Sequence, residues 1–194
     1  MKLNMKRNAL FITVVLITAV FLSCQKGDGD TAYGNTLIYM PQATSTGGLS
    51  CNYQVPSGAG ISTYNFQIDS INHKLNVILG VLRSGKESAG GYSVDVIADN
   101  DTTNQLIANN VFTNGVLLPN ASYTLPTKVI VPAGKNNATF YLSINAADLN
   151  NALYTGKNLA LTIRITNPTN YTLNTKYSKT VVIINANSIR PLLK

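Results

Sequence analysis

The chain has 194 residues, of which 45% are hydrophobic and 12% are charged. The charged share is about half of the roughly 25% usual in soluble domains, which excludes a charge-rich disordered chain and a coiled coil. The sequence holds 24 Asn and 20 Thr, residue types that favour turns and strands respectively. With one His and eight acidic residues, few groups are present for acid–base chemistry. We therefore expect neither an enzyme nor a bound metal or other cofactor.

The N-terminus has the three parts of an export signal. Three basic residues within the first seven positions precede an apolar run over 9–22, and Ser23 stands directly before Cys24. The run is shorter than the ~20 residues of a membrane-spanning helix. The sequence Phe21-Leu22-Ser23-Cys24 resembles a bacterial lipobox. The resemblance implies a signal peptide over 1–23 and lipidation of Cys24 as the mature N-terminus; an ordinary secretory signal is the alternative.

The charge and the cysteines of the mature chain restrict its partners further. Cleavage before Cys24 leaves a net charge of +4 with no basic cluster, so nucleic-acid binding is not expected. A lipid on Cys24 leaves Cys51 without a disulfide partner in the chain. Stability then has to come from packing.

Residues 24–35 are rich in Gly and Asp and predict a flexible tether. Asp28 and Asp30, close behind the lipidated Cys, resemble the acidic export signal of surface lipoproteins in glycan-foraging gut bacteria. This resemblance implies a protein that is anchored by its lipid in the outer membrane and faces the cell exterior.

From residue 36 onward the main signal is alternation of apolar and polar residues, which predicts strands. The segment 180–184 is apolar on both faces and predicts a central strand, whereas 102–109, capped by Asp101, and 146–153 predict short helices. The segments 84–91 and 132–135 are interpreted as hairpin turns. About seven to nine strands and one or two short helices predict an all-β fold, an immunoglobulin-like β-sandwich, as a single domain over 36–194. The predicted strands are 36–39, 64–68, 77–81, 92–98, 123–125, 128–131, 140–144, 159–166 and 180–184.

An ordered set of short motifs carries a family resemblance. The motifs are Leu75–Gly85, Gly91–Val96, Tyr123–Pro126, Val131–Gly134, Ala138–Leu142 and Leu161–Pro168. In this order they resemble a domain-of-unknown-function family from surface lipoproteins of gut bacteria. The same domain precedes glycoside hydrolase family 18 modules in endo-β-N-acetylglucosaminidases. The resemblance implies an immunoglobulin-like sandwich and a place in glycan utilisation, and it transfers no catalytic residue.

Four patterns approach known chemistry without completing it. The segment 80–87 fits a phosphate-binding loop except that Glu87 replaces the Ser or Thr that ligates magnesium. The segment 99–101 offers oxygen ligands for calcium, but a turn and helix cap is the favoured interpretation. His73 stands alone and predicts a turn residue rather than a metal ligand. Asp95 and Asp99 can share one strand face, as a glycosidase pair would, although an exposed Asp95 is the simpler interpretation.

Ten tyrosines and no tryptophan bear on sugar binding. Sugar rings stack on exposed aromatic rings, and a phenol adds a hydrogen bond. Tyrosines at predicted strand ends or in loops are candidates for a glycan platform, and the alternative is that they cap the core. The candidates are Tyr53, Tyr92, Tyr123, Tyr154, Tyr171 and Tyr177.

Three positions, Thr31, Ser70 and Thr102, resemble the Asp-Ser/Thr-apolar acceptor used for O-glycosylation of exported proteins in these bacteria. Taken together, the sequence predicts a non-catalytic surface lipoprotein that binds or presents glycans beside outer-membrane transporters or hydrolases. The alternative is a structural or adhesive protein, such as a fimbria-like or protein-docking module.

Overall fold

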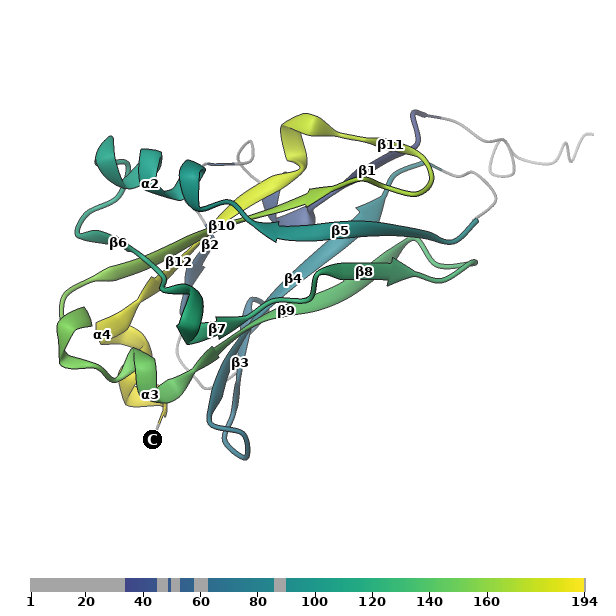
Figure 1. Cartoon of the computed structure of the whole chain (residues 1–194). Helices are drawn as coiled ribbons and strands as arrows, with labels where there is room; N and C mark the ends of the chain where they lie inside the picture. Colours follow the sequence, from purple (N-terminus) through teal and green to yellow (C-terminus); the bar gives the residue numbers. More distant parts are fainter. Residues whose placement is uncertain (1–33, 45–48, 50–52, 58–62, 86–89, 194) are drawn as a thin grey trace, which may run out of the picture. The chain divides into compact units, whose positions relative to one another are not determined.

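The computed structural model describes residues 34–44, 49, 53–57, 63–85 and 90–193. In this part of the chain two six-stranded sheets pack face to face, and the predicted β-sandwich is confirmed (Figure 1). The predictions made for Cys24, Thr31, Cys51 and Glu87 concern residues outside the described part of the chain. No helix in the described segments is long and apolar enough to cross a membrane.

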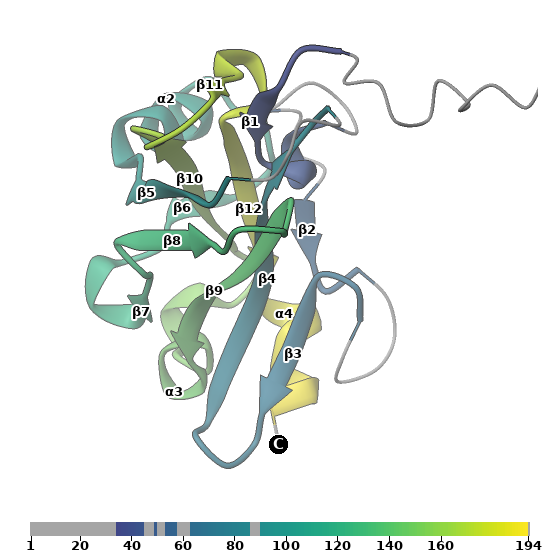
Figure 2. The same ribbon diagram turned by 90° about the vertical axis from the view of Figure 1, so that its right-hand side faces the viewer.

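Sheet A is ordered β11-β1-β4-β9-β7, and β3 pairs with β4 beside this path. Among the described strands of sheet A, only β1 and β11 pair in parallel. The β3–β4 hairpin extends away from the rest of the sandwich (Figure 2). The strands of sheet A are β1 (Leu37–Tyr39), β3 (Phe66–Asp69), β4 (Lys74–Arg83), β7 (Tyr123–Thr124), β9 (Asn137–Asn145) and β11 (Thr172–Leu173).

Sheet B is ordered β2-β12-β10-β5-β8, and β6 pairs in parallel with the start of β10. β12 lies between β2 and β10, so the prediction of an internal strand at 180–184 is confirmed. The strands of sheet B are β2 (Tyr53–Val55), β5 (Tyr92–Ala98), β6 (Gly115–Leu117), β8 (Lys128–Val131), β10 (Asn158–Thr166) and β12 (Lys179–Asn185).

The core lies between the sheets because alternate side chains of each long strand point inward. In β4 the buried positions include Leu75, Val77 and Leu79, and in β9 they include Leu142 and Ile144. Sheet B contributes its inward residues to the same core. Burial of one face therefore fixes the register that the alternation predicts.

The outer face of sheet B carries a second, smaller apolar cluster. Ala160, Val181 and Ile183 are buried there, and Leu106 of α2 and Phe112 cover them. This cover explains why β12 is apolar on both faces. The helices are α2 (Asn100–Ala108), α3 (Ala146–Leu149) and α4 (Ala186–Ile189), with 3-10 turns η2 (Pro41–Ala43), η3 (Asn120–Ser122), η4 (Ala152–Tyr154), η5 (Thr175–Tyr177) and η6 (Arg190–Leu193).

Both predicted hairpin turns are wrong. β4 and β5, which flank 84–91, lie in different sheets, and so do β8 and β9, which flank 132–135. Alternation on both sides of a turn shows that each of the two strands buries one face. Two strands of one sheet and two strands of facing sheets both meet this condition, so alternation does not distinguish a hairpin from a connection between sheets. The described strands also number twelve rather than seven to nine, because short segments such as β2, β6 and β11 pair along longer strands.

The described part of the chain has three short α-helices rather than one or two, because α4 follows β12 where no helix was predicted, and the two predicted helices differ at their ends. α2 begins at Asn100, one residue after its N-cap Asp99, whose side chain accepts a hydrogen bond from Thr102 N at 3.0 Å. The prediction of Asp101 as the cap is therefore wrong; Asp101 lies in the first turn instead. The second predicted helix divides into α3 and η4, which are separated by Asn150 and Asn151.

Candidate functional site

The six tyrosines proposed as a glycan platform are all in contact with the core. Tyr92 belongs to it, and the other five pack against it as partly buried side chains. Their rings therefore offer little free face, although the prediction that they bind glycan stays open to the experiment below. The five are Tyr53, Tyr123, Tyr154, Tyr171 and Tyr177.

Tyr53 contacts the part of β4 that lies between its pairings with β3 and with β1. β3 covers the edge of β4 up to Val77, and β1 covers it from Leu82. Between them the Tyr53 hydroxyl donates to the carbonyl of Ile78, and the amide of Gly80 donates to Gln42 Oε1 at 3.2 Å. Burial raises the pKa of the Tyr53 phenol well above its ordinary value, against the opposing effect of the Gln42 hydrogen bond.

Tyr92 and Tyr171 form a second structural cluster. Their ring centroids lie 5.9 Å apart in an edge-to-face arrangement, and Arg83 Cζ lies 5.1 Å from the centroid of the Tyr171 ring. The hydroxyl of Tyr92 donates to Asn136 O at 3.0 Å, and that of Tyr171 donates to Gly90 O at 3.2 Å. Both phenols therefore tie loops to the sandwich.

Two tyrosines that sequence reasoning did not select are exposed. Tyr64 is 76% exposed just before β3, and Tyr141 is 40% exposed in the middle of β9. The sequence does indicate that Tyr141 is exposed, because it is the aromatic residue on the polar face of an alternating strand. Tyr141 was not among the predicted glycan-binding residues because only tyrosines at strand ends and in loops were considered.

Tyr141 lines a groove formed by residues of β8, of β9 and of the segment between β7 and β8. The strands β8 and β9 belong to different sheets and run next to each other at this side of the sandwich (Figure 2). The groove has a volume of about 620 Å³, within the roughly 300–1,000 Å³ of small-ligand sites. Ile130, which is exposed, and Lys128 line it from β8. The remaining lining residues are Thr124, Leu125, Pro126, Val129, Ala138, Thr139, Phe140 and Ser143.

A row of polar side chains crosses sheet A beside Tyr141. Thr124 of β7 pairs with Ser143 of β9, which in turn pairs with Asn76 of β4. Ser143 Oγ donates to Asn76 Oδ1 at 2.7 Å. Because these residues and Tyr141 lie on the same outward face, an aromatic ring stands next to a series of hydroxyl and amide groups. Such a surface can stack on the apolar face of a sugar and hydrogen-bond its hydroxyls.

The two carboxylates considered as a glycosidase pair each have partners of their own. Asp95 accepts from Asn167 Nδ2 at 3.0 Å and pairs with Lys128 Nζ at 3.2 Å. Those hydrogen bonds, with the lysine charge, hold the pKa of Asp95 below its ordinary value. A glycosidase acid needs a raised pKa instead.

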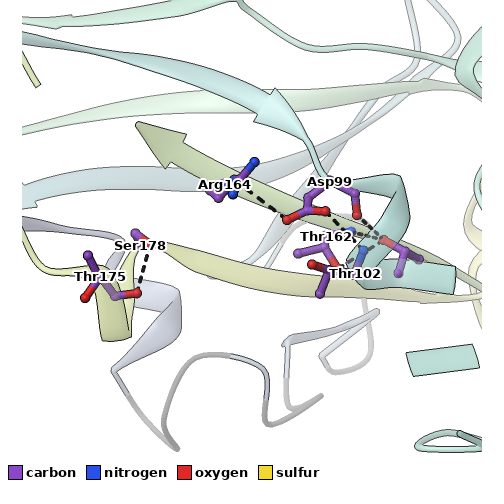
Figure 3. A network of polar contacts seen from close by, with 7 residues as sticks. Asp99, Thr102, Thr162, Arg164, Thr175 and Ser178 are labelled. Atoms are coloured by element: carbon purple, nitrogen blue, oxygen red, sulfur yellow. Dashed lines mark hydrogen bonds and ion pairs between the residues drawn. The ribbon is translucent and has the colours of Figure 1, made fainter. Parts of the chain in front are cut away.

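Asp99 stands between Arg164 and the start of α2 (Figure 3). Burial raises its pKa, but the hydrogen bonds from Thr102 and the positive charges of Arg164 and Lys179 outweigh this effect. The pKa of Asp99 therefore lies below its ordinary value. Its side chain completes a helix cap and an ion pair, with Arg164 Nε 3.7 Å from Asp99 Oδ2.

The other candidate residues lie at separate places. His73 is an exposed turn residue of the β3–β4 hairpin with φ of 52°. Ser70 is exposed in the same turn, and Thr102 is half-buried in the first turn of α2, so the structure does not bring these two acceptor positions together. Among the described residues no group of three or more His, Cys, Asp or Glu is placed to hold a metal ion.

A protein-family model described as an N-terminal domain matches residues 33–172. The chain belongs to this N-terminal domain family. A search of curated proteins gives no match. Among solved structures, a protein of unknown function from Bacteroides ovatus is 16% identical with a TM-score of 0.53, over 78% of this chain and 46% of that one. A second protein of that species, described as "a putative carbohydrate binding protein", is 12% identical with a TM-score of 0.51, over 76% and 36%.

These structural matches show that the N-terminal domain family shares its sandwich fold with larger proteins. The chain spans less than half of the length of both solved structures.

Proposed function

We propose that this chain is a non-catalytic, lipid-anchored domain of the bacterial outer membrane that binds glycans in the groove beside Tyr141. The observation that carries the proposal is the exposed Tyr141 ring in a groove lined by the hydroxyls of Thr124, Thr139 and Ser143. The fold match to a protein described as carbohydrate-binding supports it. The lipobox supports the anchor, since a triacylated Cys exceeds the two acyl chains that suffice for stable attachment.

The shape of the groove favours a chain-like ligand. It is open along β8 and β9 rather than closed around its contents. Of its described lining residues, Lys128 alone is charged, and Lys128 pairs with Asp95. A neutral oligosaccharide lying along the strands would cover the Tyr141 ring and meet the hydroxyl row. Charged glycans would gain little from this surface.

A glycan array tests the proposal. The sample is residues 25–194, which contain the whole compact unit Gly34–Lys194, and the array carries host N-glycans, mucin O-glycans and plant polysaccharides. We expect binding that Tyr141→Ala weakens about tenfold or more, the effect of losing about 1.4 kcal/mol. The matched control is Tyr64→Ala, which removes an exposed tyrosine outside the groove and leaves binding unchanged.

Two results would overturn the proposal. Binding that survives Tyr141→Ala but is lost when the six core-contacting tyrosines are changed singly would return the site to those residues. A folded protein that binds no glycan would favour the protein-docking alternative, with pull-down from outer membranes as the next step. Co-purification of a family 18 glycoside hydrolase in that pull-down would support the enzyme partnership that the family resemblance implies.

A further inference from the structure

A second pocket lies on the opposite side of the sandwich from sheet A, on the outer face of sheet B. It has a volume of about 490 Å³, again within the roughly 300–1,000 Å³ of small-ligand sites. We call it the amide pocket, because Gln54, Asn158 and Asn185 line it together with Phe112, Thr113 and Ser188. It shares no lining residue with the groove beside Tyr141.

The strand register places the amides next to each other. Asn158 of β10 pairs with Asn185 of β12, two residues beyond the pair of Ala160 and Ile183. Side chains two residues apart share a sheet face, so the asparagines continue the outer face whose apolar part is covered by α2 and Phe112. Gln54 of β2 pairs with Ile183 and lines the pocket from the neighbouring strand. The pocket is therefore the uncovered polar end of an otherwise buried surface.

Hydrogen bonds fix the orientation of both asparagines. Asn158 Nδ2 donates to Thr113 O at 2.8 Å, and Asn185 Nδ2 donates to Asn158 Oδ1 at 3.2 Å. Asn185 Oδ1 accepts from Ser188 N at 2.9 Å. A primary amide has two N–H donors and two lone pairs on its oxygen. Within the described part of the chain, each asparagine thus keeps one N–H and one lone pair for a ligand.

Among the described residues that line the pocket, none carries a charged side chain. A charged ligand would lose its hydration without a counter-charge, so the chemistry favours a neutral one. Paired donors and acceptors on fixed amides match hydroxyl groups, each of which donates and accepts. Phe112 adds an aromatic wall against which the C–H face of a sugar can pack.

We propose that the amide pocket binds a compact, uncharged, polyhydroxylated molecule of one or two sugar units. This site is distinct from the groove beside Tyr141. The proposal for the amide pocket does not depend on the function proposed for that groove. Gln54, Asn158 and Asn185 supply the hydrogen bonds, and Phe112 supplies the apolar contact.

The test uses isotope-labelled residues 25–194 and follows the Asn and Gln side-chain amide signals by NMR. The probes are glucose, galactose, mannose, fucose, N-acetylglucosamine, lactose and cellobiose, each titrated to roughly 10 mM, where even weak binding is measurable. We expect at least one probe to shift the amide signals of Asn158 and Asn185 in a saturable way. Glucose 6-phosphate and glucuronate, which carry charge, serve as the comparison and should leave these signals unshifted.

Gln54→Ala is the diagnostic variant because Gln54 is exposed on an edge strand and its side chain makes no hydrogen bond to the described residues. Loss of one ligand hydrogen bond should weaken binding roughly three- to tenfold. Gln67→Ala, the same change on β3 outside both pockets, and Tyr141→Ala should leave the affinity unchanged. The proposal is overturned if no neutral probe shifts the asparagine amides, if the charged sugars bind equally well, or if Gln54→Ala binds like the unaltered chain.

Discussion

Replacing Thr103 by Val should destabilise the sandwich by at least about 1–3 kcal/mol, the cost of leaving a buried polar group without a partner. Thr103 of α2 is 0% exposed. Its Oγ1 accepts a hydrogen bond from Thr162 N at 2.8 Å and lies within donating distance of Asp99 O at 2.9 Å and of Thr162 Oγ1 at 3.0 Å. Val has almost the same shape and a similar helix propensity, so the substitution removes the hydroxyl and little else.

The size of the effect follows from where β5 ends. The β5–β10 pairing stops at Ala98 and Ile163, and just beyond it the backbone of Thr162 points toward α2. Asp99 N satisfies the carbonyl of Thr162 at 2.8 Å, and Thr103 Oγ1 satisfies its N–H. In the Val variant this N–H stays buried without an acceptor. The side chain of Thr103 therefore takes the place of a strand partner for the backbone of β10 just beyond the end of β5.

Equilibrium unfolding in urea measures the change, with circular dichroism as the signal because the chain has no tryptophan. For a domain of this size each kcal/mol corresponds to about 2–4 °C in melting temperature. Thr172→Val, at an exposed position of β11, is the matched control and should stay within about 0.5 kcal/mol of the unaltered chain. A Thr103→Val protein as stable as this control would refute the reasoning.

Three further predictions concern packing and titration. Gly115→Ala should lower the free energy of unfolding by about 1–3 kcal/mol, an ordinary overpacking effect, because a Cβ there would lie 2.4 Å from Phe112 Cε2. Unchanged stability would show that the Phe112 ring moves freely. Asp99 has a lowered pKa in the folded protein, so its contribution to stability is present above the unfolded pKa of about 4 and is lost as pH falls through the folded value. Asp99→Asn should therefore reduce the loss of stability between neutral and acidic pH, and an unchanged loss would contradict this. Burial raises the pKa of Tyr92 to about 12 against the lowering effect of Arg83, and comparison of ultraviolet titrations with Tyr92→Phe should show one phenol fewer ionising near that pH rather than near 10.

The longer strands could be predicted because their information is local. β5 has the boundaries that alternation indicates, and β9, β10 and β12 extend the predicted segments by one to three residues at an end. In each of these strands every second side chain enters the core, and the sequence shows this as an apolar residue at every second position. The apolar faces of β12 likewise identified an internal strand, since both faces of that strand are covered.

The pairing of the strands could not be read in the same way. β2, β6 and β11 have two or three residues each, and they are strands because β12, β10 and β1 offer them a free edge. The assignment of β4 and β5 to different sheets depends on contacts between residues far apart in the chain. Alternation carries no record of the partner strand.

The candidate sites show the same division. The sequence by itself determined the alternating sandwich strands, the tyrosine-rich and amide-rich composition and the small number of acidic groups. Only the tertiary structure decided that Tyr141 is exposed in a groove while Tyr92 is buried, and that Asn158 and Asn185 face each other. The physical reason is that burial along a strand repeats every two residues, so the local sequence is enough to indicate it. The exposure of a ring and the contact between two amides depend instead on which distant segments of the chain cover that face of the sheet.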